Sequence, residues 1–596
     1  MTGGVQLLTK AAPIGQSGPP PTLPALSPAD APFAIGITGH RLERLAGIDL
    51  TALAERVAQA LAATEAAAPV ARFRLVGALA EGADTIAADV ALARGWRVDA
   101  ILPFAREEYA RDFEQPGAAA RFRDHLTQAN CIFELPGERD ESGGPAAYER
   151  AGRVMLAQSD LLLAIWDGDP PRGRGGAAQI VVEAVGQGVP VLTIHPDPAR
   201  PPELLWSGLN AHEFGPESVD TVARGGLADL SRLFAALTPA RDEAPPRVGG
   251  WAGKVLRPFF SLPYPLLLAA TGVRQLRLAD LTGPKPAPRA ISADSTSFDA
   301  RIGERLLPWF DAADHAASIA AQLFRGAFVS NFALAALSVT LSLLGLVAPL
   351  PLKPVLVLGE FASISVILLI THIGGKAGWH GRWLHQRRLA ERLRCLAVAA
   401  PLGELLLRDG GRATGLERTI ARALGLPSAR VDAAYLAHAH ASLVALLDDQ
   451  IGYLEREAGR MNRLEHRLHR TGGVLFSITA AVCVGVLVLD GLAALDTSVF
   501  GGWAEHLPIG VTVVSATLPA IGAAIYGVRM QGDFSGAAER NQELAAQLAQ
   551  LRRVAVDERP AFDGLRRLAR RTAELLAQDV SQWFRASLAR PLTLPG

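Results

Sequence analysis

The sequence has little cysteine, no excess of charge of either sign and no recognisable signal peptide. Its three cysteines, Cys131, Cys395 and Cys483, lie far apart among 596 residues, and their spacing fits neither a disulfide framework nor a metal site. We interpret them as reduced packing residues. Lys and Arg together number 59, as do Asp and Glu, so the overall charge does not favour nucleic-acid binding. The N-terminus lacks a basic stretch followed by an apolar run, and we expect everything before Ala327 to be cytosolic.

Four long apolar runs predict membrane-spanning helices. The first two, Ala327–Leu350 and Val355–Ile373, are separated by so short a loop that only an antiparallel hairpin can form. Gly472–Leu489 and Leu507–Val528 form a second hairpin with a longer loop. A bilayer core is crossed by about 20 apolar residues in helical form. The sequence therefore predicts a multi-pass membrane protein, whose remaining parts must connect to these helices.

Between Phe33 and Pro196, short β-rich runs alternate with Ala-rich helical stretches. The predicted strands are Phe33–Thr38, Phe73–Ala78, Arg97–Leu102, Cys131–Leu135, Asp160–Trp166 and Val189–Ile194. Such alternation predicts a Rossmann-like, doubly wound parallel sheet with helices on both faces. In such sheets, ligands bind beyond the carboxyl ends of the strands.

Glycines and polar residues gather at three of these strand ends. Glycine lets a backbone approach a ligand closely, and N–H groups at a helix start bind phosphate. We therefore predict a nucleotide or phosphosugar site; the alternative is a set of tight turns in an ordinary α/β domain. The candidate binding residues are Gly36, Thr38, Gly39, His40, Arg41, Gly77, Glu81, Gly82, Asp84, Trp166, Asp167, Gly168, Gly175 and Gly176.

Four short motifs within this region are similar to those of a known superfamily. They are Gly36–Arg41, the turn Glu81–Asp84, the strand end Asp160–Gly168, and Gly175–Gly176 before a helix. In combination they resemble the SLOG superfamily, which includes the DprA and LOG proteins and the nucleotide-sensing domains of bacterial defence systems. The resemblance implies a Rossmann-like fold that binds a nucleotide second messenger or an NAD-derived molecule, with no further cofactor.

One departure from the superfamily concerns catalysis. LOG hydrolases carry a Pro-Gly-Gly-x-Gly-Thr-x-x-Glu motif, whereas here the stretch from Gly175 to Glu183 lacks the threonine and displaces the glutamate. His40, Asp84 and Asp167 could do acid–base chemistry, but each could equally hydrogen-bond a ribose or cap a helix. We therefore expect ligand binding without turnover and assign no catalytic residue.

The stretch from Lys376 to Arg470 is long, helical and basic. Its last part places apolar residues seven apart, which is typical of a coiled-coil-like seam; these residues are Leu447, Leu454, Met461 and Leu468. The histidines on this stretch, His438, His440, His466 and His469, have no cluster of carboxylates or thiols beside them, so we predict no metal site. Cations concentrate beside this stretch, whereas the outer loops hold only Lys353. By the positive-inside rule, both termini are cytosolic.

Composition and periodicity divide the chain into a series of parts. They are a disordered arm (1–32), a nucleotide-binding domain (33–200), a connector (201–310), a first transmembrane hairpin unit (311–400), a cytosolic helical region (401–470), a second hairpin unit (471–555) and C-terminal cytosolic helices (556–596). The two hairpin units read as a repeat, because each is followed by an Ala-Glu-Arg triplet, at Ala390–Arg392 and Ala538–Arg540.

This tandem arrangement resembles the SLATT family of two-helix membrane units, which implies a pore-forming or membrane-perturbing effector. We expect a nucleotide-sensing effector of a bacterial antiviral system, multi-pass in the inner membrane and assembled as a homo-oligomer. A membrane-anchored nucleotide hydrolase is one alternative. A small-solute or ion transporter is another, although the spans contain only one acidic residue, Glu360, and transporters place polar groups at mid-membrane.

Overall fold

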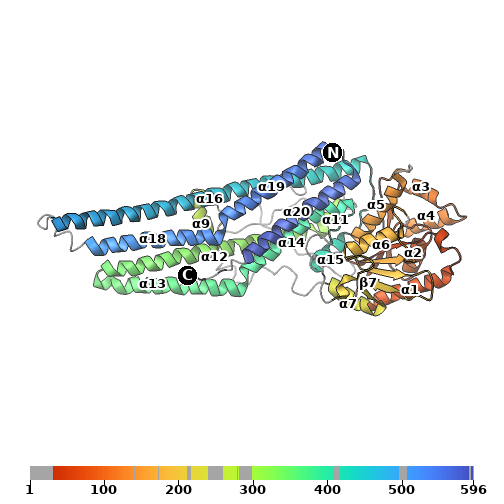
Figure 1. The fold of residues 1–596 in the computed structure, drawn as a ribbon, viewed down its shortest axis with the longest axis horizontal. Coiled ribbons are helices and arrows are strands. Elements are labelled where there is room, and N and C mark those ends of the chain that lie inside the picture. Colours follow the sequence, from red (N-terminus) through yellow and green to blue (C-terminus); the bar gives the residue numbers. More distant parts are fainter. Residues whose placement is uncertain are drawn as a thin grey trace.

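The computed structural model describes residues 31–139, 143–171, 173–210, 217–238, 260–277, 280, 298–407, 415–495, 507–588, 592 and 594. The arm predicted at 1–32 lies almost wholly outside these residues. Figure 1 shows a sheet domain at one end of an elongated molecule and a bundle of long helices extending from it. The predicted fold class, a Rossmann-like domain followed by a helical membrane region, is confirmed.

The sheet is parallel over most of its width. Its six principal strands are β1 (Phe33–Gly39), β2 (Phe73–Gly77), β3 (Arg97–Leu102), β4 (Cys131–Glu134), β5 (Leu161–Ile165) and β6 (Val191–Ile194). They lie in the order β6-β5-β1-β2-β3-β4. The chain therefore leaves β1 in one direction towards β4 and returns on its other side at β5. This reversal between β1 and β5 defines a doubly wound sheet.

Helices cover both faces of the sheet, because successive side chains of a strand point to opposite faces. Along β1, Ala34 lies in one buried core and Ile35 in the other. One face carries α1 (Leu50–Ala67), α2 (Ala83–Ala93), α4 (Ala118–Gln128) and α7 (Leu230–Leu237). The other face carries α5 (Gly143–Gln158) and α6 (Ala177–Gly186).

Three short strands extend the sheet beyond the predicted ones. On the β6 side, β7 (Glu203–Leu205) and β8 (Arg224–Gly225) add antiparallel, so the sheet continues past the boundary placed at residue 200. On the opposite edge, β9 (Ala429–Arg430) pairs in parallel with β4. This last strand comes from the helical half of the chain, so it joins the two halves by backbone hydrogen bonds.

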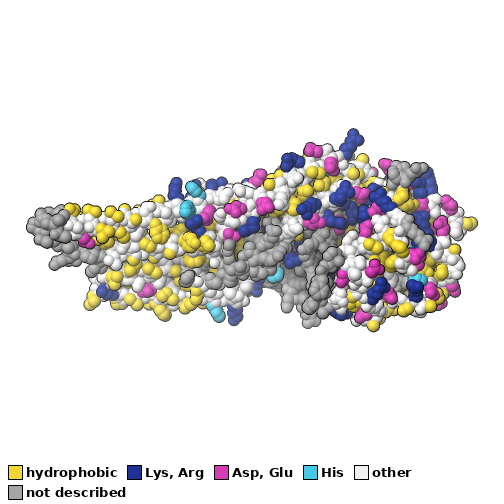
Figure 2. Space-filling view, in the orientation of Figure 1, with side chains coloured by type: hydrophobic (Ala, Val, Ile, Leu, Met, Phe, Trp, Pro, Cys, Tyr) yellow, Lys and Arg dark blue, Asp and Glu magenta, His cyan; other side chains and the backbone are white. Residues whose placement is uncertain are grey.

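The helical half contains two hairpins of the same design. The first consists of α12 (Leu307–Val347), α13 (Lys353–Ala377) and α14 (Trp379–Ala399), and the second of α16 (Ala433–Leu495), α18 (Leu507–Gly532) and α19 (Phe534–Asp557). Within the described residues, four helical segments are long and apolar enough to cross a membrane. Figure 2 shows hydrophobic side chains over much of this end of the molecule. Each of the four predicted spans thus falls on a helix of membrane-crossing length and apolarity, which indicates a membrane protein.

A left-handed residue follows the second span of each hairpin and turns the chain into its return helix. It is Gly378 (φ 61°) in the first unit and Asp533 (φ 46°) in the second; aspartate is one of the few non-glycine residues that tolerate this conformation. Ala390 follows its turn by twelve residues, but Ala538 follows its turn by only five. The structural equivalent of Ala390 is therefore Ala545, and the two Ala-Glu-Arg triplets are not equivalent positions.

Aligning α14 and α19 on these left-handed turns reveals a repeat in sequence that the Ala-Glu-Arg triplets do not show. It pairs glycines, leucines and alanines of α14 with identical residues of α19: Gly381 with Gly536, Leu389 with Leu544, Ala390 with Ala545, and Leu393 with Leu548. The leucines and alanines of this set are buried. The repeated element is thus the face with which each return helix packs on its own hairpin.

The predicted seam of α16 is buried against other helices of the same chain. Leu447 is fully buried, and Leu454, Met461 and Leu468 are 6%, 4% and 3% exposed. The first two share a core with Leu544 of α19, and the last two share one with residues of α12 and α18. The seven-residue spacing therefore identified the packing face correctly.

A buried ion pair fixes the sheet to the helical half. Arg422, on α15 (Gly415–Leu424), donates two hydrogen bonds to the Asp160 carboxylate just before β5, at 2.8 and 2.9 Å. The two side chains are only 3% and 2% exposed. The Ala34 N–H also donates to Asp160 at 3.0 Å, and the guanidinium lies 4.0 Å from the centre of the Phe33 ring. Both charges are therefore satisfied away from water.

Removing one partner of this pair tests its importance. Arg422→Ala leaves the Asp160 carboxylate buried without its cation, and we expect the free energy of unfolding to fall by about 3–5 kcal/mol. Thermal unfolding of the full-length protein in detergent measures the change. The matched control is Arg430→Ala, because Arg430 is 62% exposed and lies 3.9 Å from Glu107; it should alter stability by no more than about 0.5 kcal/mol. Equal effects of the two substitutions would contradict this assignment.

Candidate functional site

The candidate site lies where the strand order reverses. Gly39 of β1 is in register with Ile165 of β5, so the segments that follow, His40–Arg41 and Trp166–Gly168, start side by side. The loop after β2 joins them, since Arg41 forms an isolated bridge with Gly82. In doubly wound sheets this edge is where ligands bind.

His40 and Asp167 meet across this reversal. His40 Nε2 lies 3.1 Å from Asp167 Oδ2 and accepts a hydrogen bond from the Asp167 N–H at 3.2 Å. Burial lowers the pKa of His40, so the imidazole is neutral at pH 7, as an acceptor nitrogen requires. Burial acts to raise the pKa of Asp167, but a hydrogen bond from the Asp169 N–H and the neighbouring His40 and Arg44 outweigh it, and the pKa is lowered.

Asp167 is also bound to Arg44, whose Nη2 lies 2.5 Å from its carboxylate. His40 is thus a neutral imidazole, and the negative charge of the Asp167 carboxylate beside it is balanced by Arg44. Such an arrangement can orient a ligand hydroxyl, and its proton-transfer capacity is restricted because the carboxylate is already occupied.

Arg41 belongs to a second cluster that the sequence did not predict. Its guanidinium lies over the Tyr148 ring at 5.1 Å and 3.4 Å from Asp112. Tyr148 donates to Asp112, and Arg139 pairs with the same carboxylate at 2.6 Å. About half of the Arg41 side chain remains exposed. A half-exposed guanidinium stacked on an aromatic ring is well placed to receive a phosphate or a base.

Asp84 is the most strongly perturbed acid at this edge. It lies in the first turn of α2, is 7% exposed, and accepts a hydrogen bond from the Ala80 N–H at 3.4 Å. Burial raises its pKa to about 7, opposed by backbone hydrogen bonds and by Arg41. An acid poised at neutral pH beside a strand end is a candidate functional group.

The predicted glycines have different roles. A Cβ on Gly36 would lie 2.3 Å from Met155 Sδ, so the absence of a side chain here lets α5 pack closely against the sheet. Gly36 therefore does not face the edge where ligands bind. Gly39 and Gly82 allow the loops to meet, with an added Cβ reaching Ala83 Cβ at 2.4 Å and the His40 carbonyl at 2.6 Å respectively. Gly77 similarly approaches Ile37 at 2.4 Å.

Two of the predicted glycines have open space before them. An added Cβ would meet nothing within 4 Å at Gly168, and only the Gly173 carbonyl, at 3.9 Å, at Gly176. Gly176 is the N-cap of α6, so N–H groups of the first helical turn begin beside it. These are the positions at which a phosphate could approach backbone without displacing a side chain.

The loop before α6 is held by a polar network. The Gly175 N–H donates to Gln179 Oε1 at 2.7 Å, and Gln179 donates to Glu149 of α5 at 2.9 Å. Glu183, the displaced glutamate, pairs with Arg153 of α5 at 2.8 Å. Glu183 therefore lies on the contact between α5 and α6, almost two helical turns beyond the N-cap.

The structure thus brings His40, Arg41, Gly82, Asp84 and Asp167 together, with Tyr148 linking them towards the α6 loop. Thr38 and Glu81 are half-buried, whereas Trp166 is buried, and its indole N–H donates to the Asp169 carbonyl at 2.9 Å. Arg172, in the same loop, lies outside the described residues. Sequence reasoning missed Asp112, Arg139 and Tyr148, because none of them follows a strand directly.

Comparisons with known proteins and a search for metal-ligand groups give no assignment. No family model and no curated protein matches the chain. Among the described residues, no group of three or more His, Cys, Asp or Glu side chains could hold a metal ion. The site must be interpreted from its own geometry.

The raised pKa of Asp84 predicts a pH dependence. An unfolded aspartate has a pKa of about 3.9, so between about pH 4 and 7 the folded protein retains a proton that the unfolded chain releases. The contribution of Asp84 to stability is therefore full below pH 4 and is lost as pH rises through 7, by roughly 1.4 kcal/mol per unit of pKa shift.

Thermal unfolding of the wild type and of Asp84→Asn across pH 4–8 measures this effect. The wild type should lose stability relative to the variant up to pH 7, after which the difference should be constant. Asp124→Asn is the control, because Asp124 is exposed on α4. Parallel curves for wild type and Asp84→Asn would show that Asp84 ionises normally.

Proposed function

We propose that this protein is a nucleotide-responsive membrane effector, in which a ligand at the β1/β5 edge alters the four spans. The observation that supports this best is that helix α5 connects the candidate site to the helical half of the chain. Its N-terminal half contributes Tyr148 and Glu149 to the candidate site, and its last residue, Gln158, donates to the Gly403 carbonyl of the helical half at 3.0 Å. One helix therefore touches both the site and the helical half of the chain, at Gly403 just after the return helix of the first hairpin.

The chemistry of the edge fits a phosphate-bearing ligand. The open N-terminus of α6 at Gly176 and the half-exposed Arg41 offer donors and positive charge. His40 and Asp167 offer hydrogen bonds that suit a ribose. A nucleotide or an NAD-derived molecule combines these groups, as the resemblance to the SLOG superfamily also implies.

In this proposal the membrane region opens a pore or disrupts the bacterial inner membrane, with both termini cytosolic. Four spans in one chain enclose little space, so a homo-oligomer is part of the proposal. Ligand binding can shift the closed–open equilibrium only by its differential affinity for the two states. An antiviral role follows from the SLOG and SLATT resemblances.

Asp84 favours a second candidate function, a membrane-anchored nucleotide hydrolase. A carboxyl whose pKa is near 7 can donate or accept a proton at cytosolic pH. Against this, Asp84 already accepts from the Ala80 N–H, which suits a role in shaping the β2 loop. Release of free base from a nucleoside monophosphate by the wild type, and its loss in Asp84→Asn, would favour the hydrolase.

A charge at Gly176 tests the location of the phosphate. Gly176→Glu should abolish binding of whichever nucleotide mass spectrometry finds retained by the purified protein, because the carboxylate repels phosphate and fills its position. Gly186→Glu, at the other end of α6 and also in open space, is the matched control and should bind normally. Calorimetry distinguishes them, and unchanged affinity in Gly176→Glu would place the site elsewhere.

An ion pair between α5 and α20 (Phe562–Leu588) tests the coupling. Arg150 Nε lies 2.9 Å from Asp563 Oδ2. Arg150→Asp or Asp563→Arg places like charges together and should shift the closed–open equilibrium by up to about 1 kcal/mol, or about fivefold. The double variant restores opposite charges. We expect ligand-triggered dye release from vesicles to change in each single variant and to return to the wild-type level in the double variant. The intrinsic affinity of the site for its ligand should be unaltered in all of them.

This experiment also separates the coupling from the fold. Dye release that is the same in all four proteins would exclude α5 as the connection. Dye release that is lost in both singles and not restored in the double would indicate damage to packing and not a broken pair.

A further inference from the structure

A small cavity lies between the two hairpins, and its lining contains no residue of the sheet. Its volume is about 70 Å³, and a buried water occupies about 10–15 Å³ on this measure, so the cavity has room for a group of several heavy atoms. Its lining comes from both hairpin units and from α9 (Pro263–Ala270). The lining residues used below are Tyr264, Arg325, His380, Trp383, Asp533 and Arg540.

The cavity has a buried donor without a partner. Tyr264 is 6% exposed, and its hydroxyl makes no hydrogen bond within the described structure. Burial raises the pKa of Tyr264, so the hydroxyl keeps its proton. A buried hydroxyl without a partner costs about 1–3 kcal/mol, and such a group in a native protein calls for an acceptor that completes it.

Arg325 supplies an excess positive charge beside this hydroxyl. Its guanidinium lies between two rings, 5.4 Å from the centre of Tyr264 and 5.1 Å from that of Trp383. No hydrogen bond or ion pair of this guanidinium is present among the described residues. The rings hold the cation in place without neutralising it, so its donors are available to an anion.

The other charges around the cavity are paired with one another. Arg540 lies 3.0 Å from Asp533. Arg460 and Glu457 are both near Tyr264, and they lie 2.5 Å from each other. His380 stacks on the Phe324 ring at 4.4 Å, and burial lowers its pKa, so it adds no full charge. The cavity therefore carries the net charge of Arg325 and favours an anion.

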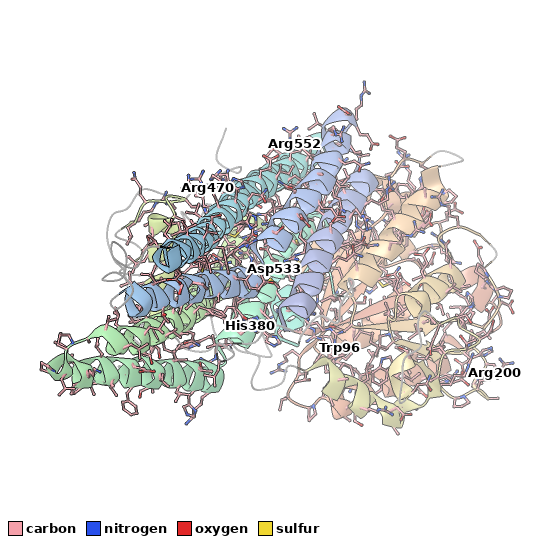
Figure 3. The ribbon with its side chains drawn as sticks, turned by 60° about the vertical axis from the view of Figure 1, so that its left-hand side comes forward. Trp96, Arg200, His380, Arg470, Asp533 and Arg552 are labelled. Atoms are coloured by element: carbon pink, nitrogen blue, oxygen red, sulfur yellow. The ribbon has the colours of Figure 1, made fainter. Side chains whose placement is uncertain are left out.

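The cavity lies at the level where the spans end. Its walls include Asp533, the turn after the fourth span, and His380, which is two residues after the turn at Gly378; Figure 3 labels both at the junction of the bundle with the helices that lead to the sheet. Aromatic side chains concentrate at membrane interfaces. Basic pockets between spans on the cytoplasmic side suit anionic head groups.

We propose that this cavity binds the phosphate group of an anionic lipid of the cytoplasmic leaflet. The Tyr264 hydroxyl donates a hydrogen bond to a phosphate oxygen, and the Arg325 guanidinium donates to a second oxygen from between its two rings. The bound lipid would fill the space between the return turns of the two hairpins. This site is separate from the strand-end site and does not depend on the proposed nucleotide response.

The test uses full-length protein in a neutral detergent, titrated with phosphatidylglycerol, phosphatidylcholine or inorganic phosphate and followed by its unfolding temperature. Phosphatidylglycerol should stabilise the wild type in a saturable manner. Arg325→Gln should weaken its binding about tenfold or more, and Tyr264→Phe about fivefold. Arg463→Gln removes an exposed cation that does not line the cavity, and is the matched control.

Each outcome bears on the proposal. Equal weakening by Arg325→Gln and Arg463→Gln would overturn it in favour of diffuse surface charge. Equal stabilisation by phosphatidylcholine would exclude recognition of an anion. Saturable binding of inorganic phosphate with no effect of phosphatidylglycerol would keep the phosphate site and overturn the lipid as its source. Should Arg325→Gln fail to fold, Tyr264→Phe, which removes one oxygen atom, still decides the matter.

Discussion

The union of sheet and membrane helices depends on the buried ion pair of Asp160 and Arg422. Its cost in lost hydration is large, and it is offset only because the carboxylate receives two guanidinium hydrogen bonds and a backbone N–H together. Removing either side chain would leave the other charge buried and uncompensated. A hydrophobic core that runs from α5 and α6 into α14, α16, α19 and α20 also joins the two halves. The sheet is therefore not a tethered module, and its strands and the helical half form one body.

The sequence was sufficient to predict those helices and strands that contain a long apolar run. Six strands were found close to their observed limits, and each of the four predicted spans falls on a long apolar helix, because continuous apolar runs have few alternatives. The strands β7, β8 and β9 were missed, since two or three residues show no period. For β9 the reason is stronger: its partner, β4, lies almost 300 residues earlier, and no local pattern can indicate a pairing at that separation.

At the candidate site, position along the chain predicted only part of the geometry. His40, Asp84 and Asp167 were found because strand ends of a parallel sheet share one edge. Tyr148 and Asp112 reach the same place from helices, which only tertiary structure reveals. Gly36 and Gly176 looked alike in sequence, yet one meets α5 and the other meets open space. The role of a glycine is decided by what lies opposite it.

The continuity of α16 has a mechanical consequence. Two residues after β9, the edge strand, the chain enters a single unbroken helix of 63 residues that ends beyond the third span. At 1.5 Å per residue this is a rod of about 95 Å, so a tilt of about 5° at the sheet would displace its far end by about 8 Å. The protein thus contains a lever arm whose short end is a strand of the Rossmann-like sheet. A change too small to alter the sheet's hydrogen bonding could still be large at the far end of this helix.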